Sequence, residues 1–363
     1  MKLTRFLMLM LSSAALFVAC EGGEEQQPQQ KVNITLSSDV ESGMVGESVT
    51  FTVVTEDGTD VTANAKFIDK SSDYAVVSNP YVLPYDGKIE VYAMYGENKS
   101  NTITITAKLG FPMLEEDNNP TKVNFSHRML LVDHTGSKCT FCPKMMNALK
   151  EIEETDGYHE KYYEVMCHSY SNNISADKAY SAAAGVISGF FGVNEHPTLT
   201  YNFDTSKKST YNDNIKGNID SYWGAMEGDA GIAAVTLIGR SCVNTEVAVK
   251  VKSAGEYRLT AWLLEDGVEQ AQAGYTAEWQ NIHNNVVRSI ISNDPLSGID
   301  LGTMEAGSCI KKSIAFENIH RMWVPENFKV LFIVSKLGAD GHYSVANVAL
   351  CPGNDNIDFA YLD

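Results

Sequence analysis

The chain has 363 residues and a formal net charge of −18 at pH 7, because 46 acidic side chains outnumber 28 basic ones. Binding to nucleic-acid phosphates needs a basic surface, so this charge excludes a nucleic-acid-binding protein as the leading interpretation. The length predicts two or three domains.

Residues 1–19 have the pattern of a signal peptide, with a basic N-terminus and an apolar run too short to span a membrane as a helix. The stretch Leu16-Phe17-Val18-Ala19-Cys20 resembles a bacterial lipobox. This resemblance implies cleavage before Cys20 and lipidation of that residue. Several acyl chains would anchor the protein firmly to the outer membrane, on its periplasmic or its cell-surface side. An ordinary secreted protein with a free Cys20 thiol is the alternative.

Residues 20–31 are acidic and rich in glutamine, which predicts a flexible tether because they cannot bury apolar surface. Acidic residues directly after a lipidated cysteine resemble the surface-export signal of Bacteroidetes lipoproteins. A solvated linker without a signal explains them equally well.

Residues 32–108 predict a β-sandwich, because short stretches of alternating apolar and polar residues are separated by turn sequences such as Asp57-Gly58 and Asp86-Gly87. The stretches at residues 46–51 and 57–62 resemble a bacterial immunoglobulin-like module. The resemblance implies a spacer, with an adhesive ligand-binding module as the alternative. Residues 109–126 follow as a linker.

The sequence Cys139-Thr140-Phe141-Cys142-Pro143 is the main candidate for a functional site. A buried strand is predicted at residues 129–132, and a helix is predicted from Cys142, with apolar residues recurring every three or four positions. A CxxC between a strand and a helix is typical of a redox pair. The helix N-terminus and Lys138 should lower the pKa of the Cys139 thiol.

Three features around this motif resemble the thioredoxin superfamily: the CxxC itself, Asp133 six residues upstream, and His196-Pro197 downstream. The resemblance implies that Cys139 attacks, Cys142 resolves, Asp133 accepts a proton, and Pro197 is a cis-proline. A thioredoxin-like α/β domain is expected over residues 127–228, with a second helix around residues 176–184. Lys138 replaces the usual tryptophan, which argues against a general reductase. His196 either tunes the thiolate or is a surface loop residue.

Two alternatives to a catalytic pair remain open. A zinc site would need two further ligands at similar spacing, and the other cysteines are isolated. A Cys139–Cys142 disulfide that is only structural is the stronger alternative.

Seven cysteines leave six once Cys20 is assigned to the lipid. Cys167 lies in a strand-like run and is expected as a buried free thiol. Cys242, Cys309 and Cys351 could provide one disulfide in an oxidising compartment. The preferred pair is Cys309–Cys351, because both residues flank strands near the chain end.

Residues 229–363 predict a second β-sandwich, so the expected fold class is multidomain α+β. The stretches at residues 135–143 and 283–288 resemble the 28-kilodalton outer membrane protein family of Bacteroidetes. This resemblance covers about two thirds of the chain, from His127 to the end, and implies a thioredoxin-fold lipoprotein without a settled activity. His283 and Arg288 are either functional or hydrogen-bonded anchors of a turn and a strand.

Two functions therefore remain open from the sequence. The first is thiol–disulfide exchange on exported proteins, and the second is binding or adhesion by a surface lipoprotein whose disulfide is not catalytic. Neither hypothesis calls for a cofactor or a metal. The expected partners are the outer membrane, through the lipid anchor, and exported protein thiols or disulfides.

The lipobox yields a direct prediction. Cys20→Ala should leave the protein without acyl chains and release it from membranes, because the acyl chains on this residue are the expected anchor. Sedimentation of membranes and detergent phase partitioning measure the outcome. A variant that still sediments with membranes would exclude the lipoprotein hypothesis.

Overall fold

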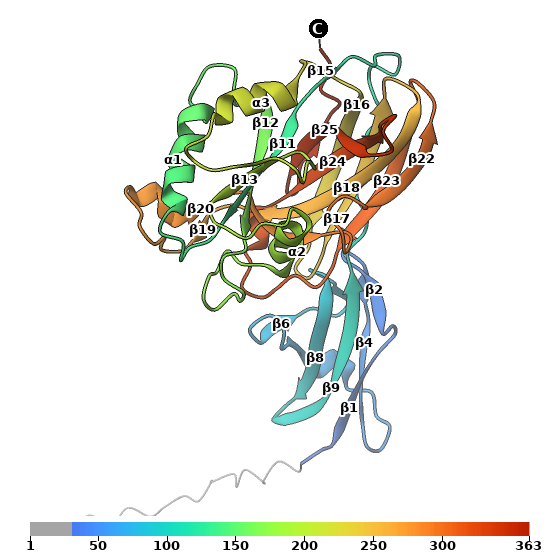
Figure 1. Cartoon of the computed structure of the whole chain (residues 1–363). Helices are drawn as coiled ribbons and strands as arrows, with labels where there is room; N and C mark the ends of the chain where they lie inside the picture. The colour runs from blue at the N-terminus through green and yellow to red at the C-terminus, as the bar shows by residue number, and fades with distance from the viewer. Residues whose placement is uncertain (1–30, 363) are drawn as a thin grey trace, which may run out of the picture.

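The computed structural model describes residues 31–362. The predicted signal peptide, Cys20 and nearly all of the predicted tether lie outside the described residues. The described chain forms an N-terminal β module and a larger mixed body (Figure 1). None of its helices is long and apolar enough to cross a membrane.

The N-terminal β module, residues 32–108, consists of three sheets around one apolar core. Its strands are β1 (Ile34–Ser38), β2 (Ser42–Met44), β3 (Ser48–Val49), β4 (Phe51–Thr55), β5 (Lys66–Asp69), β6 (Ala75–Val77), β7 (Tyr81–Val82), β8 (Gly87–Tyr95) and β9 (Asn98–Lys108). The β1–β4 pair faces the sheet β2-β9-β8-β5-β6, and Leu36, Phe51 and Ile89 fill the space between them. The predicted alternation is visible in β1 and β4, where inward residues are buried and their neighbours exposed.

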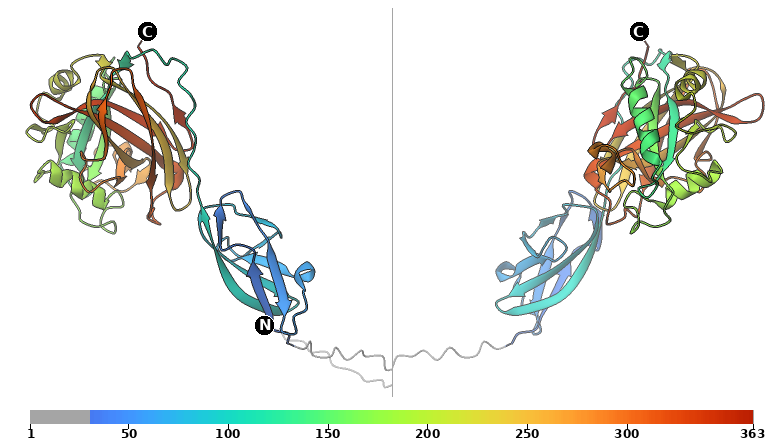
Figure 2. Two further views of the ribbon diagram at one scale, coloured as in Figure 1. Left: turned by 90° about the vertical axis from the view of Figure 1, so that its right-hand side faces the viewer. Right: turned by 60° about the vertical axis from the view of Figure 1, so that its left-hand side comes forward.

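The segment after β9 is packed against the body rather than free (Figure 2). Leu114 is buried, and its N–H donates to Glu246 at 2.7 Å. The buried ammonium of Lys250 lies 2.9 Å from the carboxylate of Asp117. Asp86 of the module accepts the backbone N–H of Ser241 at 2.8 Å. The N-terminal β module is therefore joined to the body by specific polar contacts as well as by the chain.

The body is built on a nine-stranded sheet with the order β14-β13-β11-β12-β21-β18-β24-β25, in which β22 also pairs with β18. The bounds of these strands are β11 (Met129–Thr135), β12 (Tyr162–His168), β13 (Thr198–Tyr201), β14 (Lys208–Ser209), β18 (Gly255–Glu265), β21 (Val286–Ile290), β22 (Ile299–Met304), β24 (Phe328–Leu337) and β25 (Tyr343–Pro352). The β11–β12 and β12–β21 pairs are parallel, and the other pairs are antiparallel.

A second sheet of four strands, in the order β23-β17-β16-β26, packs on the C-terminal half of the first. Its strands are β16 (Ala230–Ile238), β17 (Val243–Val251), β23 (Cys309–Phe316) and β26 (Asn356–Ile357). Val247, Leu259 and Phe332 are among the buried residues that fill the space between the two sheets. Two short pairs complete the body, β10 (Phe125–Ser126) with β15 (Glu227–Gly228), and β19 (Val268–Glu269) with β20 (Ile282–His283).

The helices lie on the two faces of the N-terminal half of the nine-stranded sheet. They are α1 (Cys142–Glu153), α2 (Ala182–Phe190) and α3 (Ile215–Trp223). Met129 and Leu131 point to the face covered by α1 and α3, whereas Leu130 and Val132 point to the face covered by α2. This alternation places side chains of successive β11 residues in different cores, and it puts Asp133 on the α1 face.

The structure corrects two details of the prediction. The second helix begins at Ala182 rather than near residue 176, because the Ser181 hydroxyl accepts the N–H of Ala184 and caps it there. The boundary expected between residues 228 and 229 does not separate two sheets, since Met166 of β12 pairs with Val286 of β21. The strand that follows residue 203, β14, has only two residues.

Candidate functional site

Cys139 and Cys142 form a disulfide at the start of α1, with their sulfur atoms 2.15 Å apart. Cys142 is the first residue of the helix, and Pro143 follows where no N–H donor is required. The N–H of Cys142 points at Sγ of Cys139, 3.1 Å away. A backbone donor aimed at this sulfur would stabilise a thiolate there once the pair is reduced.

Asp133 lies beneath this helix without a polar partner. Its side chain is fully buried, and neither carboxyl oxygen has a hydrogen-bond partner. It shares a face of β11 with Leu131, which packs in one cluster with Met145 and Leu149 of α1. Burial, and to a lesser extent the charge of Glu164, raises the pKa of Asp133 well above its ordinary value. A carboxyl with a raised pKa therefore lies close to the helix that carries the cysteines.

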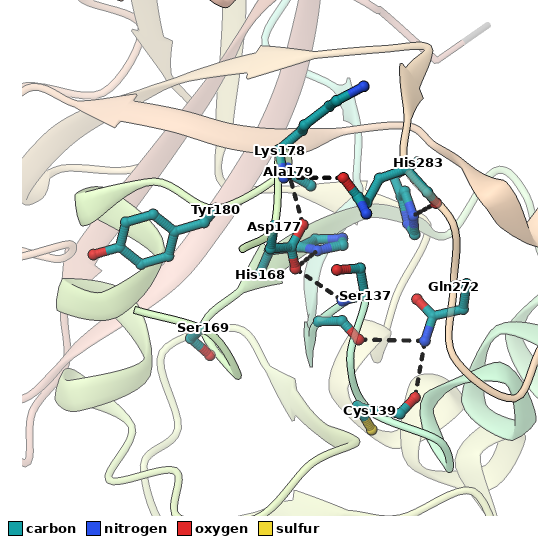
Figure 3. Close-up of polar contacts among 12 residues, drawn as sticks. Ser137, Cys139, His168, Ser169, Asp177, Lys178, Ala179, Tyr180, Gln272 and His283 are labelled. Atoms are coloured by element: carbon teal, nitrogen blue, oxygen red, sulfur yellow. Dashed lines mark hydrogen bonds and ion pairs between the residues drawn. The ribbon is translucent and has the colours of Figure 1, made fainter. Parts of the chain in front are cut away.

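A second buried carboxylate, Asp177, fixes the turn that leads to Cys139 (Figure 3). Its Oδ2 accepts the N–H of Ser137 at 2.8 Å and lies 2.9 Å from Nδ1 of His168. Its Oδ1 accepts the N–H of Ala179 at 3.0 Å. Burial alone would raise the pKa of Asp177, but the hydrogen bonds from His168 and from these two backbone groups hold it well below its ordinary value.

The two residues singled out from the 283–288 stretch make anchoring contacts. Nε2 of His283 lies 3.0 Å from the carbonyl oxygen of Gln270, and its ring stands edge-on to His168 with centroids 4.6 Å apart. Burial, and next the neighbouring His168, lowers the pKa of His283 to about 4. Arg288 donates to the buried carboxylate of Glu265 at 2.6 Å. Both residues therefore hold strands and turns in place.

The peptide bond between His196 and Pro197 is cis. Thr198 pairs with His134 of β11, which places Pro197 beside the end of that strand, where the turn to Cys139 begins. His196 is half-buried, and its Nε2 lies 2.9 Å from the hydroxyl of Ser169. Burial, and then His168, lowers the pKa of His196.

A chain of hydrogen bonds continues from His196 into the interior. The Ser169 hydroxyl accepts from Ser188 at 2.8 Å, and Ser188 in turn lies 2.8 Å from Nδ1 of His134. Burial lowers the pKa of His134 to about 3, so this imidazole is neutral at physiological pH. His196 is thus part of a buried polar network rather than an isolated surface residue.

Residues 268–283, which we call the cover segment, lie across the cysteine turn (Figure 3). The segment runs from β19 through a short 3-10 helix (Glu278–Asn281) to β20. The side-chain N–H groups of Gln272 donate to the carbonyl oxygens of Cys139 at 2.8 Å and Gly136 at 3.3 Å. The N–H of Ala273 donates to the carbonyl of Ser137 at 2.7 Å.

The cover segment also reaches the first turn of α1. The side chain of Gln280 donates to the carbonyl of Pro143 and to Asn147, each at 3.0 Å. Gly274 has a φ of +72°, and a Cβ at this position would lie 2.5 Å from the carbonyl oxygen of Thr140. Cys139 is consequently only 3% exposed. A partner that reaches this sulfur must first displace part of the cover segment.

The predicted disulfide among the C-terminal cysteines is wrong. Cys242, Cys309 and Cys351 are all free, as is the buried Cys167. Cys309 is exposed on β23 of the four-stranded sheet, whereas Cys351 is buried on β25 of the nine-stranded sheet. Proximity to the chain end suggested the pair, but sheet assignment separates the two strands. Within residues 31–362, no group of three or more His, Cys, Asp or Glu could hold a metal ion.

The fold and the site thus define a class of protein in which a cysteine pair lies at the start of a helix that packs on a mixed β-sheet. The chain matches no family model, and it matches none of the curated proteins. Among solved structures, it is similar to HBP35 of Porphyromonas gingivalis, with a TM-score of 0.52 and 19% sequence identity. The similarity covers 63% of this chain and 76% of HBP35, and it shows a shared fold.

The sequence analysis singled out the cysteine pair, Asp133 and Pro197. The structure places Cys139, Cys142 and Asp133 around α1, whereas Pro197 lies beside the end of β11. The sequence analysis missed Asp177 and the glutamines of the cover segment. No local signal marks them, because Gln272 lies more than 130 residues from the carbonyls that it contacts.

The cover segment yields a prediction about access. Gln272→Ala removes two hydrogen bonds to the cysteine turn, each worth about 1 kcal/mol, and should raise the rate of reduction by dithiothreitol by up to roughly thirtyfold. The four free cysteines of the described chain are blocked first, and the new thiols are then counted by mass spectrometry over time.

Glu269→Ala is the matched control, since it lies in the same segment with its side chain exposed. It should leave the rate of reduction unchanged. Equal rates for Gln272→Ala and the unaltered protein would show that the cover segment does not limit access to the disulfide.

Asp133 yields a prediction about pH. Because its pKa is raised in the folded protein, the folded state holds a proton that the unfolded state loses above about pH 4, so stability falls as pH rises. Asp133→Asn removes this loss. The difference in free energy of unfolding, variant minus unaltered protein, should therefore increase by up to about 1.4 kcal/mol per pH unit above pH 4.

Urea unfolding of the oxidised protein between pH 4 and 8 measures this difference. Tryptophan fluorescence reports on the body alone, because all four tryptophans lie between residues 223 and 323. A difference that stays constant with pH would contradict the raised pKa of Asp133, whatever its absolute size.

Proposed function

We propose that this protein is an outer-membrane-anchored lipoprotein whose body is thioredoxin-like and exchanges disulfides with exported proteins. The observation that carries the proposal is the Cys139–Cys142 disulfide at the start of α1, with the unpartnered buried carboxyl of Asp133 beneath the same helix. The resemblance of the sequence around these residues to the thioredoxin superfamily supports it.

The proposed exchange begins with the reduced pair. The Cys139 thiolate attacks one sulfur of a substrate disulfide, forms a mixed disulfide and releases the other substrate sulfur as a thiolate. The Cys142 thiolate then attacks Sγ of Cys139, which releases the second substrate thiolate and closes the Cys139–Cys142 disulfide. Two electrons pass from the protein to the substrate, and the reverse sequence oxidises a substrate dithiol.

The ionised form of Asp133 would take the proton of Cys142 when that thiol becomes the attacking group. A carboxyl with a raised pKa suits this role because its proton affinity is closer to that of a thiol. The backbone N–H of Cys142 and the N-terminal end of α1 would favour the Cys139 thiolate. Lys138 is exposed next to Cys139 and adds a positive charge to the surface that a partner meets.

The rest of the chain would bring this site to exported partners. The lipobox at Cys20 supports an anchor in the outer membrane, facing the periplasm or the cell surface. The N-terminal β module, proposed to be immunoglobulin-like, would act as a spacer between the membrane and the body. The shared fold with HBP35 of Porphyromonas gingivalis agrees with the Bacteroidetes family that the sequence resembles.

One observation favours the second function, a binding or adhesion lipoprotein with a structural disulfide. Cys139 is almost fully buried, and the cover segment makes hydrogen bonds to its turn. A disulfide that is never meant to exchange would be shielded in this way. Trapping of partners separates the two functions.

Cys142→Ser should trap mixed disulfides between Cys139 and exported proteins, because the resolving thiol is missing. Cys139→Ser should trap none, since the remaining Cys142 is completely buried. The measurement is non-reducing electrophoresis of cells followed by mass spectrometry of the linked peptides.

Both variants should also carry Cys309→Ser, because that free thiol is exposed and would form disulfides of its own. Linked partners that map to Cys139 in the first variant only support exchange. No linked partner in either variant, with the reduced Cys139 reacting as an ordinary thiol, would favour the binding lipoprotein.

A further inference from the structure

An open groove of about 600 Å³ runs alongside α1 and is not used by the proposed exchange. One wall is formed by Met146 and Leu149 of α1, and the other by Trp279 and Ile282 of the cover segment. Tyr162 and Glu164 of β12 line the groove between these walls.

The groove follows an unpaired edge of β12. This strand pairs with β11 along its whole length, but with β21 only at Met166, whose N–H donates to the carbonyl of Asn285 at 3.0 Å. Backbone groups of alternate residues point to the same side of a strand, so those of Tyr162 and Glu164 also point toward β21. No backbone partner meets them on that side within residues 31–362.

The charged side chains that line the groove do not form ion pairs with one another within the described residues. Neither cation of the groove pairs with an acid of the groove, since Lys150 pairs with Glu154 at 2.7 Å and Arg128 donates to the carbonyl of His159 at 2.8 Å. The two acids, Glu153 and Glu164, form no ion pair in the part of the chain that the structure describes. Burial, and then the charge of Glu153, raises the pKa of Glu164 to about 7.

The walls and floor offer further unused contacts. Trp279 and Ile282, which line the same wall of the groove, are 37% and 45% exposed. Tyr162 is only 6% exposed, and its buried hydroxyl has no hydrogen-bond partner. The groove thus combines free backbone groups, an apolar wall and uncompensated carboxyl groups.

We propose that this groove binds an extended segment of a partner polypeptide, which adds to the open edge of β12 and places a lysine or arginine side chain against Glu164 and Glu153. An extended chain supplies the alternating N–H and C=O groups that the edge lacks, while its side chains contact Trp279 and Ile282. The basic side chain compensates the two acids. This binding does not depend on exchange at the disulfide, so it stands or fails separately from the proposed function.

The probe is a positional-scanning library of acetylated, amidated hexapeptides, added to the purified full chain with the disulfide oxidised. Bound peptides should carry lysine or arginine at one position and apolar residues at alternate positions. Replacing that lysine by norleucine, or introducing Glu164→Gln, should weaken binding roughly tenfold or more, because a charge-assisted contact is lost. Fluorescence anisotropy of the labelled peptide measures the affinity.

Two further variants keep the test independent of folding. Ile282→Ala trims an exposed wall residue and should also weaken binding, whereas Glu151→Gln, on the same helix but outside the groove, should not. Methylation of the peptide nitrogen that faces β12 should abolish binding to the unaltered protein, because it removes a backbone donor.

Three results would overturn the proposal. The first is a library in which no peptide binds more tightly to the unaltered protein than to Glu164→Gln. The second is binding of lysine methyl ester as tight as that of any peptide, which would indicate a small cationic ligand. The third is a concentration-dependent dimer that Ile282→Ala disrupts, which would indicate a second copy of this chain.

Discussion

The parallel pairing of β12 with β21 is the contact on which the arrangement of the body depends. It consists of a single register position, Met166 with Val286, yet it joins the sheet that carries the cysteines to the C-terminal strands. The cover segment ends directly before β21, so this pairing also sets its position over the cysteine turn. The same pairing stops after one residue, which leaves the N-terminal half of β12 unpaired on the side of β21, where the groove beside α1 lies.

Two buried carboxyl groups beside the cysteine turn show how differently one side chain type can be used. Asp177 accepts two backbone N–H groups and a histidine contact, so its charge is compensated and it fixes the turn. The carboxyl of Asp133 has no hydrogen-bond partner, and burial, with a smaller contribution from the charge of Glu164, raises its pKa. The first is a structural anchor, and the second is the proposed proton acceptor for the cysteines. A buried group without compensation costs stability, which is most easily explained at a functional site.

The polar contacts of the cover segment add a constraint that a simple redox domain does not have. Gln272 and Gln280 donate to backbone carbonyls on both sides of the disulfide, so the segment is fixed to the turn and to the first turn of α1. Because Trp279 and Ile282 belong to the same segment, its inner side shields the disulfide while its outer side forms a wall of the groove. Access to the sulfur and the shape of the groove are thus properties of one stretch of chain.

The sequence by itself determined the local features of this protein. The CxxC at a helix start, the strand before it, the alternating strands of the N-terminal β module and the position of Asp133 follow from spacing and from the period of apolar residues, which are short-range properties. Pro197 was identified by resemblance, and its peptide bond is cis. The second helix was predicted several residues too early from the small residues that precede it. In the structure the Ser181 hydroxyl caps the helix, which begins at Ala182.

Only the tertiary structure decided which distant segments meet. The fusion of the two expected domains into one sheet depends on one pair of residues 120 positions apart, and no periodicity encodes that contact. The absence of a Cys309–Cys351 bond depends on the sheet to which each strand belongs, although both positions look equivalent in the sequence. Cys139 is buried under the cover segment, which Gln272 fixes by donating to the carbonyl of Cys139. This contact joins residues 133 positions apart, so the sequence around Gln272 does not reveal it. Spacing specifies what a residue can do chemically, whereas packing between remote strands decides what it contacts.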